Sequence, residues 1–168
     1  DQKKTLIEIN NDLTSKSKMF RLLQGDVGSG KTIVSLISAL NVVNSGYQVA
    51  LMAPTEILAR QHFVLAKKIF PTQINLALLS SKSENKIKKE IIDNLKTKKI
   101  DMVFGTHAIF QKKITFSNLG FIIIDEQHKF GVRQRKLLSD KGGKNCDVLL
   151  MSATPIPRTL TMSIYGDM

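Results

Sequence analysis

Apolar residues in this chain are grouped in two ways, in short runs and at intervals of three and four. The short runs lie at residues 19–23, 48–53, 75–79, 101–104, 121–124 and 148–151. Runs with apolar side chains on successive residues are typical of strands covered on both faces, and such strands usually lie in parallel sheets. The pattern therefore predicts six strands in a mostly parallel sheet.

The intervals of three and four predict helices between these strands. One is expected at residues 5–13, one after Thr32, one from the N-cap Thr55 to about Phe70, and one after residues 81–84, whose S-x-x-E spacing is typical of a capping box. Gly46 fits the left-handed position that ends a helix. Strands alternating with helices predict an α/β fold, a doubly wound sheet with helices on both faces.

The helix after Thr55 is expected to bury one polar residue. Its buried side would hold Leu58, His62, Leu65 and Ile69. On this pattern His62 is interpreted as a packing residue and not as a ligand.

The segment between the first strand and the following helix carries a specific motif. It fits the phosphate-binding pattern G-x-x-x-x-G-K-[ST] without a mismatch, as Gly25-Asp26-Val27-Gly28-Ser29-Gly30-Lys31-Thr32. Glycines let the backbone turn tightly, so that N–H groups and the helix N-terminus face a polyphosphate. We expect Lys31 to reach the β- and γ-phosphates of ATP and Thr32 to ligate Mg²⁺. The alternative, a glycine-rich turn without a ligand, has no need of Lys31 and Thr32.

Polar residues also follow the fifth and sixth strands, at the edge where ligands gather in such sheets. Asp125 and Glu126 follow three isoleucines, and we expect Asp125 to hold the metal and Glu126 to orient or deprotonate the attacking water. After the sixth strand, the hydroxyls of Ser152 and Thr154 could relay the state of the phosphates to another part of the site. Taken without the phosphate-binding motif, the pair of carboxylates and the pair of hydroxyls would each be typical of an ordinary turn after a strand.

Two further loops suit contacts with a phosphodiester backbone. Pro54 and Thr55 follow the second strand, and Gly105, Thr106 and His107 follow the fourth. Thr hydroxyls and exposed backbone N–H groups can bind phosphates without reading bases. An ordinary helix start at Gly105 and Thr106 is the alternative.

Composition adds a preference for polyanions. The 168 residues suffice for one domain with a real core, and their net charge of +11 should attract nucleotides or nucleic acid. The lysines are scattered, and those of the helix after residue 84 are expected to be solvated more than DNA-facing: Lys86, Lys88, Lys89, Lys96, Lys98 and Lys99. The single cysteine, Cys146, reads as a partly buried thiol. With no run of eighteen apolar residues and no leader, we expect no membrane partner and a cytoplasmic location.

Together these residues resemble the superfamily 2 helicases, and within them the first RecA-like motor domain of the RecG family of branch-migration helicases. The matching segments are the phosphate loop and residues 53–59 (motif Ia), 105–111 (motif Ib), 125–132 (motif II) and 152–160 (motif III). The resemblance implies that residues 1–168 are one RecA-like P-loop domain, with the motif III strand between those of the phosphate loop and motif II. It also implies that Gln2 reads adenine, that Gln127 and His128 belong to motif II and act in coupling, and that motifs Ia and Ib contact DNA. One departure is Ser80-Ser81, where the family commonly has a glycine.

The resemblance implies further parts that 168 residues cannot hold. These are a second RecA-like domain in cis, with the arginine that completes the ATP site, and a wedge domain for branched DNA. The leading hypothesis is thus the ATP-binding half of an ATP-dependent DNA helicase that remodels stalled forks and recombination junctions. Two alternatives are a transcription-repair coupling translocase, which usually has Glu in place of Gln127, and a non-catalytic nucleotide- or DNA-binding module.

Overall fold

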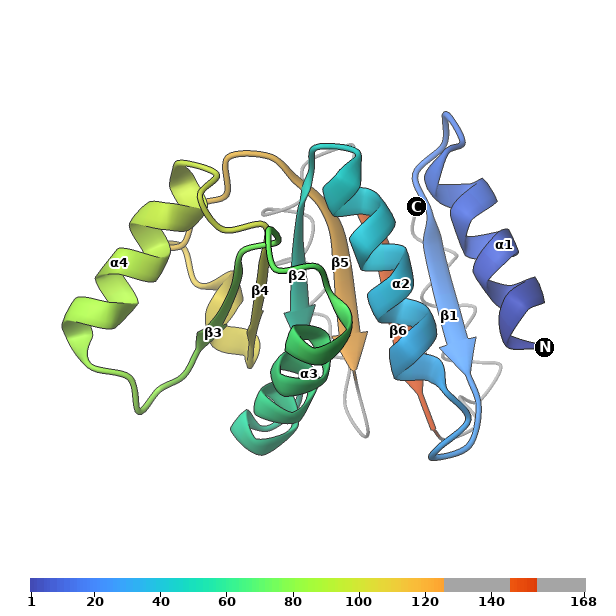
Figure 1. Cartoon of the computed structure of the whole chain (residues 1–168), viewed down its shortest axis with the longest axis horizontal. Helices are drawn as coiled ribbons and strands as arrows, with labels where there is room; N and C mark the ends of the chain where they lie inside the picture. Colours follow the sequence, from blue (N-terminus) through green and yellow to red (C-terminus); the bar gives the residue numbers. More distant parts are fainter. Residues whose placement is uncertain (126–145, 154–168) are drawn as a thin grey trace.

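The carboxyl ends of six parallel strands meet at one edge of a single sheet (Figure 1). The structure, a computed structural model, describes residues 1–125 and 146–153. The strand order is β1-β6-β5-β2-β4-β3. The strands are β1 (Phe20–Gln24), β2 (Gln48–Met52), β3 (Leu76–Leu79), β4 (Met102–Gly105), β5 (Leu119–Asp125) and β6 (Asp147–Ser152). The predicted parallel sheet is confirmed, and β6 lies between the phosphate-loop strand and β5, as the helicase resemblance implied.

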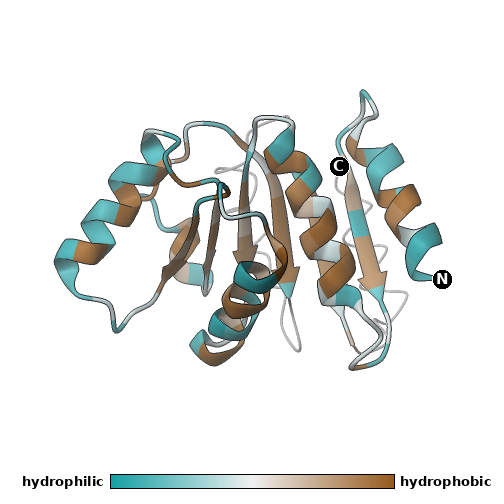
Figure 2. Cartoon of the chain, in the orientation of Figure 1, coloured by the Kyte–Doolittle hydropathy of each residue, from teal (hydrophilic) through white to brown (hydrophobic). Residues whose placement is uncertain are grey.

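Helices cover both faces of the sheet. They are α1 (Gln2–Leu13), α2 (Lys31–Asn44), α3 (Glu56–Ile69) and α4 (Asn85–Lys96), with a short 3-10 helix, η1 (His107–Phe110). Alternate residues of β5 divide the core: Phe121 and Ile123 pack with α1, α2 and α3, while Ile122 and Ile124 pack with α4 and η1. Figure 2 shows the apolar colour concentrated on the strands and the polar colour on much of the helical surface. The predicted two-sided α/β fold is therefore confirmed.

Two details of the predicted helices are wrong. Of the four residues expected on the buried side of α3, His62 is buried and Leu58 and Leu65 are half-buried against the core, but Ile69 is 41% exposed, and Ala59 and Ala66 are the other buried positions. Alanines lack the bulk that marks a core position in a sequence, yet they let a helix approach its sheet closely. The helix α1 also begins at Gln2 and not at Thr5.

The predicted capping box at residues 81–84 is wrong as well. Helix α4 has Glu84 as its N-cap, with no side-chain hydrogen bond to the first turn. The backbone N–H of Ser81 instead donates to Glu56 Oε1 at 2.6 Å, and the Ser80 hydroxyl donates to Glu56 Oε2 at 2.9 Å. Ser81 thus contacts α3, and α4 begins only at Asn85, too far along the chain for Ser81 to be its N-cap.

Polar side chains tie the loops together at the amino edge of the sheet. The Gln48 amide donates to the carbonyls of Leu95 and Ile100 and accepts from the N–H of Asn118. Asp147 accepts from the N–H of Met19 at 2.7 Å. Cys146 beside it is 1% exposed, as expected of a buried thiol, and burial raises its pKa to about 12. The loops predicted to bind ligands lie at the opposite, carboxyl edge. Within the described ranges, no helix is long and apolar enough to cross a membrane.

Candidate functional site

The phosphate-loop segment turns through two glycines with left-handed backbone. It joins the end of β1 at Gln24 to the start of α2 at Lys31, and Gly28 and Gly30 have φ values of 83° and 84°. L side chains rarely adopt this conformation, so both positions favour glycine. The backbone N–H of Gly25 also donates to the carbonyl oxygen of Ser152 at 3.2 Å, which ties the loop to the end of β6. The motif residues thus form a tight turn at a helix N-terminus, the arrangement that binds phosphate.

The Lys31 ammonium group lies inside this turn. It donates to the carbonyl oxygens of Gly25 and Asp26, the latter at 2.7 Å, and lies 3.3 Å from the Ser29 hydroxyl. A positive charge held by loop carbonyls is positioned for phosphate oxygens entering the same loop. Thr32 follows in the first turn of α2.

Gln2 contacts the same loop from helix α1. Its Nε2 donates to the carbonyl oxygen of Ser29 at 3.0 Å, and a Cβ added to Gly30 would lie 2.1 Å from that nitrogen. The glutamine therefore rests directly against the phosphate loop, whereas the need for glycine at position 30 comes from its left-handed backbone. The structure places Gln2 beside the loop, which is compatible with a role at the nucleotide, and its reading of adenine stays a prediction.

Asp125 ends β5, and a histidine holds its carboxylate. Its Oδ2 lies 2.6 Å from Nε2 of His62 on α3, with side-chain exposures of 19% and 9%. His62 is buried as expected, but the interpretation of it as a packing residue was incomplete, because it is hydrogen-bonded to the predicted metal ligand. A polar residue on an otherwise apolar helix face was the available signal, since buried polar atoms need partners. The sequence could not show which partner, because 63 residues separate the two.

The two loops predicted to contact DNA lie side by side. Strands β2 and β4 are neighbours in register, with Met52 opposite Gly105, and the N–H of Ala53 donates to the Gly105 carbonyl at 2.9 Å. The Thr55 hydroxyl caps α3 by accepting from the N–H of Leu58, which confirms the predicted N-cap. Thr106 instead precedes η1 without a side-chain cap, so Gly105 and Thr106 do open a short helix. Pro54, Thr55 and His107 are exposed.

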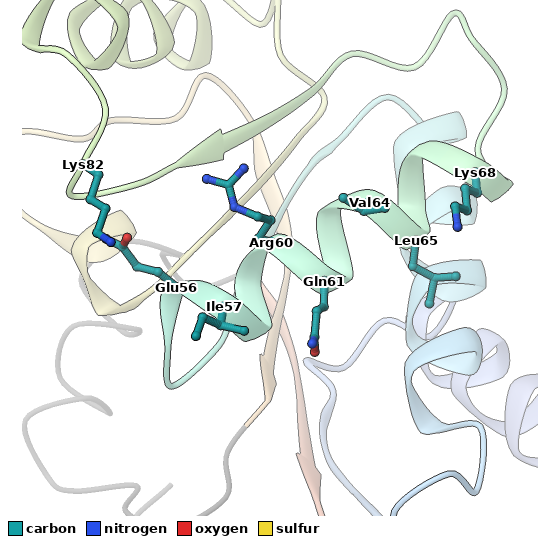
Figure 3. A pocket seen from close by; sticks show the side chains of 8 residues that line it. All are labelled: Glu56, Ile57, Arg60, Gln61, Val64, Leu65, Lys68 and Lys82. Carbon is teal, nitrogen blue, oxygen red and sulfur yellow. The ribbon is translucent and has the colours of Figure 1, made fainter.

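A basic groove follows the outer face of α3 (Figure 3). It encloses about 470 Å³ and is lined by Glu56, Ile57, Arg60, Gln61, Val64, Leu65, Lys68 and Lys82. Figure 3 shows Lys82, from the loop after β3, lying next to Glu56 at the start of α3. Sequence reasoning missed this groove, because Lys82 is brought to α3 by the packing of β3 and by the contacts of Glu56 with Ser80 and Ser81 in the folded chain.

The profile of the DEAD/DEAH box helicases matches residues 1–163. This chain belongs to the DEAD/DEAH box helicase family.

Individual helicases give a closer comparison. The chain is 53% identical to the ATP-dependent DNA helicase RecG of Aquifex aeolicus and 50% identical to that of Streptococcus pneumoniae, over 99% of its length in both cases. It spans only 21% and 25% of those two proteins. Among solved structures, RecG bound to a three-way DNA junction matches 99% of this chain and 22% of its own with a TM-score of 0.82 and 46% identity. A DEAD box protein from Methanococcus jannaschii shares the fold, with a TM-score of 0.74 at 18% identity.

These similarities confirm the resemblance to the RecG helicases and favour it over the translocase alternative. Four predicted helicase residues lie outside the described part of the chain: Glu126, Gln127, His128 and Thr154. The roles of the remaining residues stay predictions, although the structure gathers them at one edge of the sheet.

The residues present suit a hard metal ion. The hydroxyl of Thr32 and the carboxylate of Asp125 are oxygen donors at the same edge, and Mg²⁺ is usually held by one or two such protein groups together with phosphates. No cluster of three or more metal-binding side chains occurs within residues 1–125 and 146–153.

Proposed function

We propose that this chain is the ATP-binding motor domain of an ATP-dependent DNA helicase of the RecG type. The observation that carries the proposal is the Lys31 ammonium inside a left-handed glycine turn, on a sheet whose β5 ends in Asp125. Phosphate loop and carboxylate stand at the same edge, separated by β6. Similarity to helicases over the whole chain supports the same conclusion.

Each residue at this edge has a separate task in the proposal. The glycine-rich turn from Gly25 to Gly30, with the Ser29 backbone, would cradle the phosphates, and Lys31 would neutralise the β- and γ-phosphates. Thr32 and Asp125 would hold Mg²⁺, which neutralises charge on the phosphates when bound. Glu126 would orient or deprotonate the attacking water, and Gln2 would contact the adenine.

Ser152 is suited to report the state of the phosphates. Its carbonyl accepts from the N–H of Gly25, so a shift of the phosphate loop reaches the end of β6 directly. We expect Ser152 and Thr154, with Gln127 and His128 of motif II, to couple this shift to the rest of the motor.

DNA is the proposed second ligand. The paired loops of Pro54–Thr55 and Gly105–His107 would bind the phosphodiester backbone, and the basic groove of α3 extends from the first of them. The related RecG structure holds a three-way DNA junction, so we propose branched DNA as the substrate of the longer protein. A second RecA-like domain in cis would complete the motor, and such a motor would work on cytoplasmic DNA.

Calorimetry of nucleotide binding tests the proposal. The chain should bind ADP and ATP in the presence of Mg²⁺, and Lys31→Ala should weaken binding about tenfold to a hundredfold, because a charge-assisted phosphate contact contributes about 1.5–3 kcal/mol. The exposed Lys99→Ala serves as the control for loss of one positive charge. Equal affinities for the wild type and Lys31→Ala would contradict the proposal.

A further inference from the structure

Helix α3 lies between the two proposed sites and contacts both. Its N-terminus follows directly on the exposed loop residues Pro54 and Thr55. Its buried face carries His62, whose Nε2 lies 2.6 Å from Asp125 Oδ2. That separation is short for a hydrogen bond between nitrogen and oxygen, which is typical when a partner is charged.

We propose that His62 is a positioning residue that orients the Asp125 carboxylate for the metal of the bound nucleotide, and that it links this carboxylate to α3. The inference rests on the proposed function of the site. With Oδ2 held by the histidine, the other carboxylate oxygen is presented in a fixed direction as a metal ligand. Groups that hydrogen-bond to metal ligands fix their orientation, and their loss typically costs about tenfold to a hundredfold in metal affinity.

The surroundings of His62 argue against a role in packing alone. The other buried positions of α3 are Ala59 and Ala66, which contact the apolar core of this face of the sheet. A polar ring among such neighbours is unfavourable unless it is hydrogen-bonded, whereas an apolar residue would fill the space without a partner. The chain places the polar ring where it reaches the carboxylate at the end of β5.

The same contact connects the two ligands. Arg60 lies on the outer face of α3, in the basic groove, and His62 lies two residues further along on the inner face. A ligand that shifts α3 therefore also shifts the group that holds Asp125. Coupling between two binding sites is reciprocal. The Mg²⁺–nucleotide complex must therefore change the affinity for DNA at the outer face of α3 by the same factor as DNA changes the affinity for the nucleotide.

The test compares two substitutions of His62 by calorimetry of ADP binding with and without Mg²⁺. His62→Leu fills the space but removes the donor, and it should weaken Mg²⁺ binding in the ADP complex about tenfold to a hundredfold while leaving Mg²⁺-free ADP affinity unchanged. His62→Gln keeps an N–H donor near the position of Nε2 and should restore most of the loss. Lys67→Leu, at an exposed position of the same helix, is the matched control and should behave like the wild type.

Each other result would overturn the inference in a recognisable way. Equal Mg²⁺ dependence in the wild type and His62→Leu would show that the histidine does not position the carboxylate. A parallel loss of Mg²⁺-free ADP affinity would assign it a structural role instead. A wild-type chain that binds no ADP would contradict the proposed function itself, and the inference with it.

A single-stranded oligonucleotide tests the link to α3. Its addition should change the Mg²⁺–ADP affinity of the wild type and leave that of His62→Leu unchanged. No effect on the wild type, or the same effect on both proteins, would show that His62 does not connect the two ligands.

Discussion

At the scale of single residues, the Glu56 carboxylate joins α3 to the loop that follows β3. It accepts from the N–H of Ser81 and from the hydroxyl of Ser80. Hydrogen bonds from Ser81 and Ser80 hold the pKa of this carboxyl below its ordinary value of 4.5. Because the folded pKa is lowered, the contact stabilises the fold above the unfolded pKa, and this contribution is lost as the pH falls through the folded value.

We therefore expect acid to release this loop. In an NMR titration, the Ser81 amide signal should follow the Glu56 carboxyl with a midpoint below 4.5. Ser80→Ala should raise that midpoint, because one donor to the charged form is gone. Ser83→Ala, which removes a hydroxyl from the same loop without touching Glu56, should leave it unchanged. A midpoint equal in the wild type and Ser80→Ala would contradict this account.

Single residues also show what a sequence can and cannot specify. The phosphate loop was predictable residue by residue, because its chemistry requires consecutive positions in one segment. The partners His62 and Asp125 were not, since they come from different elements and meet only in the folded sheet. Contacts such as those of Glu56 likewise depend on where β3 lies relative to α3.

At the scale of elements, the exposed basic residues fall into two groups, one along the outer face of α3 and one on α4. Arg60 and Lys82 border the basic groove, close to the loops proposed to bind DNA. Helix α4, which carries several exposed lysines, packs on the opposite face of the sheet from α3. The exposure of Lys86, Lys89 and Lys96 agrees with the interpretation of these lysines as solvated, whereas Lys88 is half-buried and donates to the Ser81 carbonyl at 2.6 Å.

The two groups should differ in the salt dependence of DNA binding. Arg60→Gln or Lys82→Gln should weaken binding to all sequences alike and reduce the log–log salt slope by roughly 0.7–0.9, as expected for one lost phosphate contact. Lys89→Gln on α4 should leave both quantities unchanged. Fluorescence anisotropy at several salt concentrations measures this, and equal effects of all three substitutions would mean that binding is spread over the whole basic surface.

The elements themselves were largely predictable from the periods of apolar residues. All six strands occur within about two residues of the expected positions, because their buried runs have few alternatives. The side of α3 that packs was predicted correctly at Leu58, His62 and Leu65 but not at Ile69. Hydrophobicity predicts that Ile69 is buried. Because α3 lies close to the sheet, however, the small side chains of Ala59 and Ala66 occupy the buried positions. Likewise, Ser81 has the spacing of an N-cap for α4, but in the folded chain it binds the carboxylate of Glu56 on α3.

At the scale of the whole molecule, the described residues form a phosphate loop at the carboxyl edge of β1, but none of the arginines among them lies at this loop. Arg21 lies in β1 and is paired with Asp12 and Glu8 of α1, at 2.6 and 3.0 Å. Arg60 is on the outer face of α3. In P-loop enzymes, an arginine at the γ-phosphate contributes about 10³ to 10⁵ in rate. The helicase resemblance implies that this arginine belongs to the second motor domain.

The isolated chain should therefore bind ATP and hydrolyse it slowly, with little stimulation by branched DNA. Addition of the second motor domain, in cis or in trans, should raise turnover by orders of magnitude, and Glu126→Gln should abolish that gain while leaving nucleotide binding intact. A steady-state ATPase assay decides the matter. DNA-stimulated turnover of the isolated chain at about 1 s⁻¹ or above, within the range of ordinary enzymes, would contradict the half-site hypothesis.

The order of strands also has a consequence for how the molecule is made. Strand β1 pairs with β6 alone in the described sheet, and these two are the first and the last of the described strands along the chain. During synthesis, the segment that carries the phosphate loop must wait for Asp147–Ser152 before it can join the sheet, whereas β2 to β5 can already pair among themselves. Pairing between such distant segments is slow and leaves apolar surface exposed meanwhile. Among the described strands, the one that carries the phosphate loop is thus the last to join the sheet, and a nascent chain that lacks β6 leaves β1 without its partner.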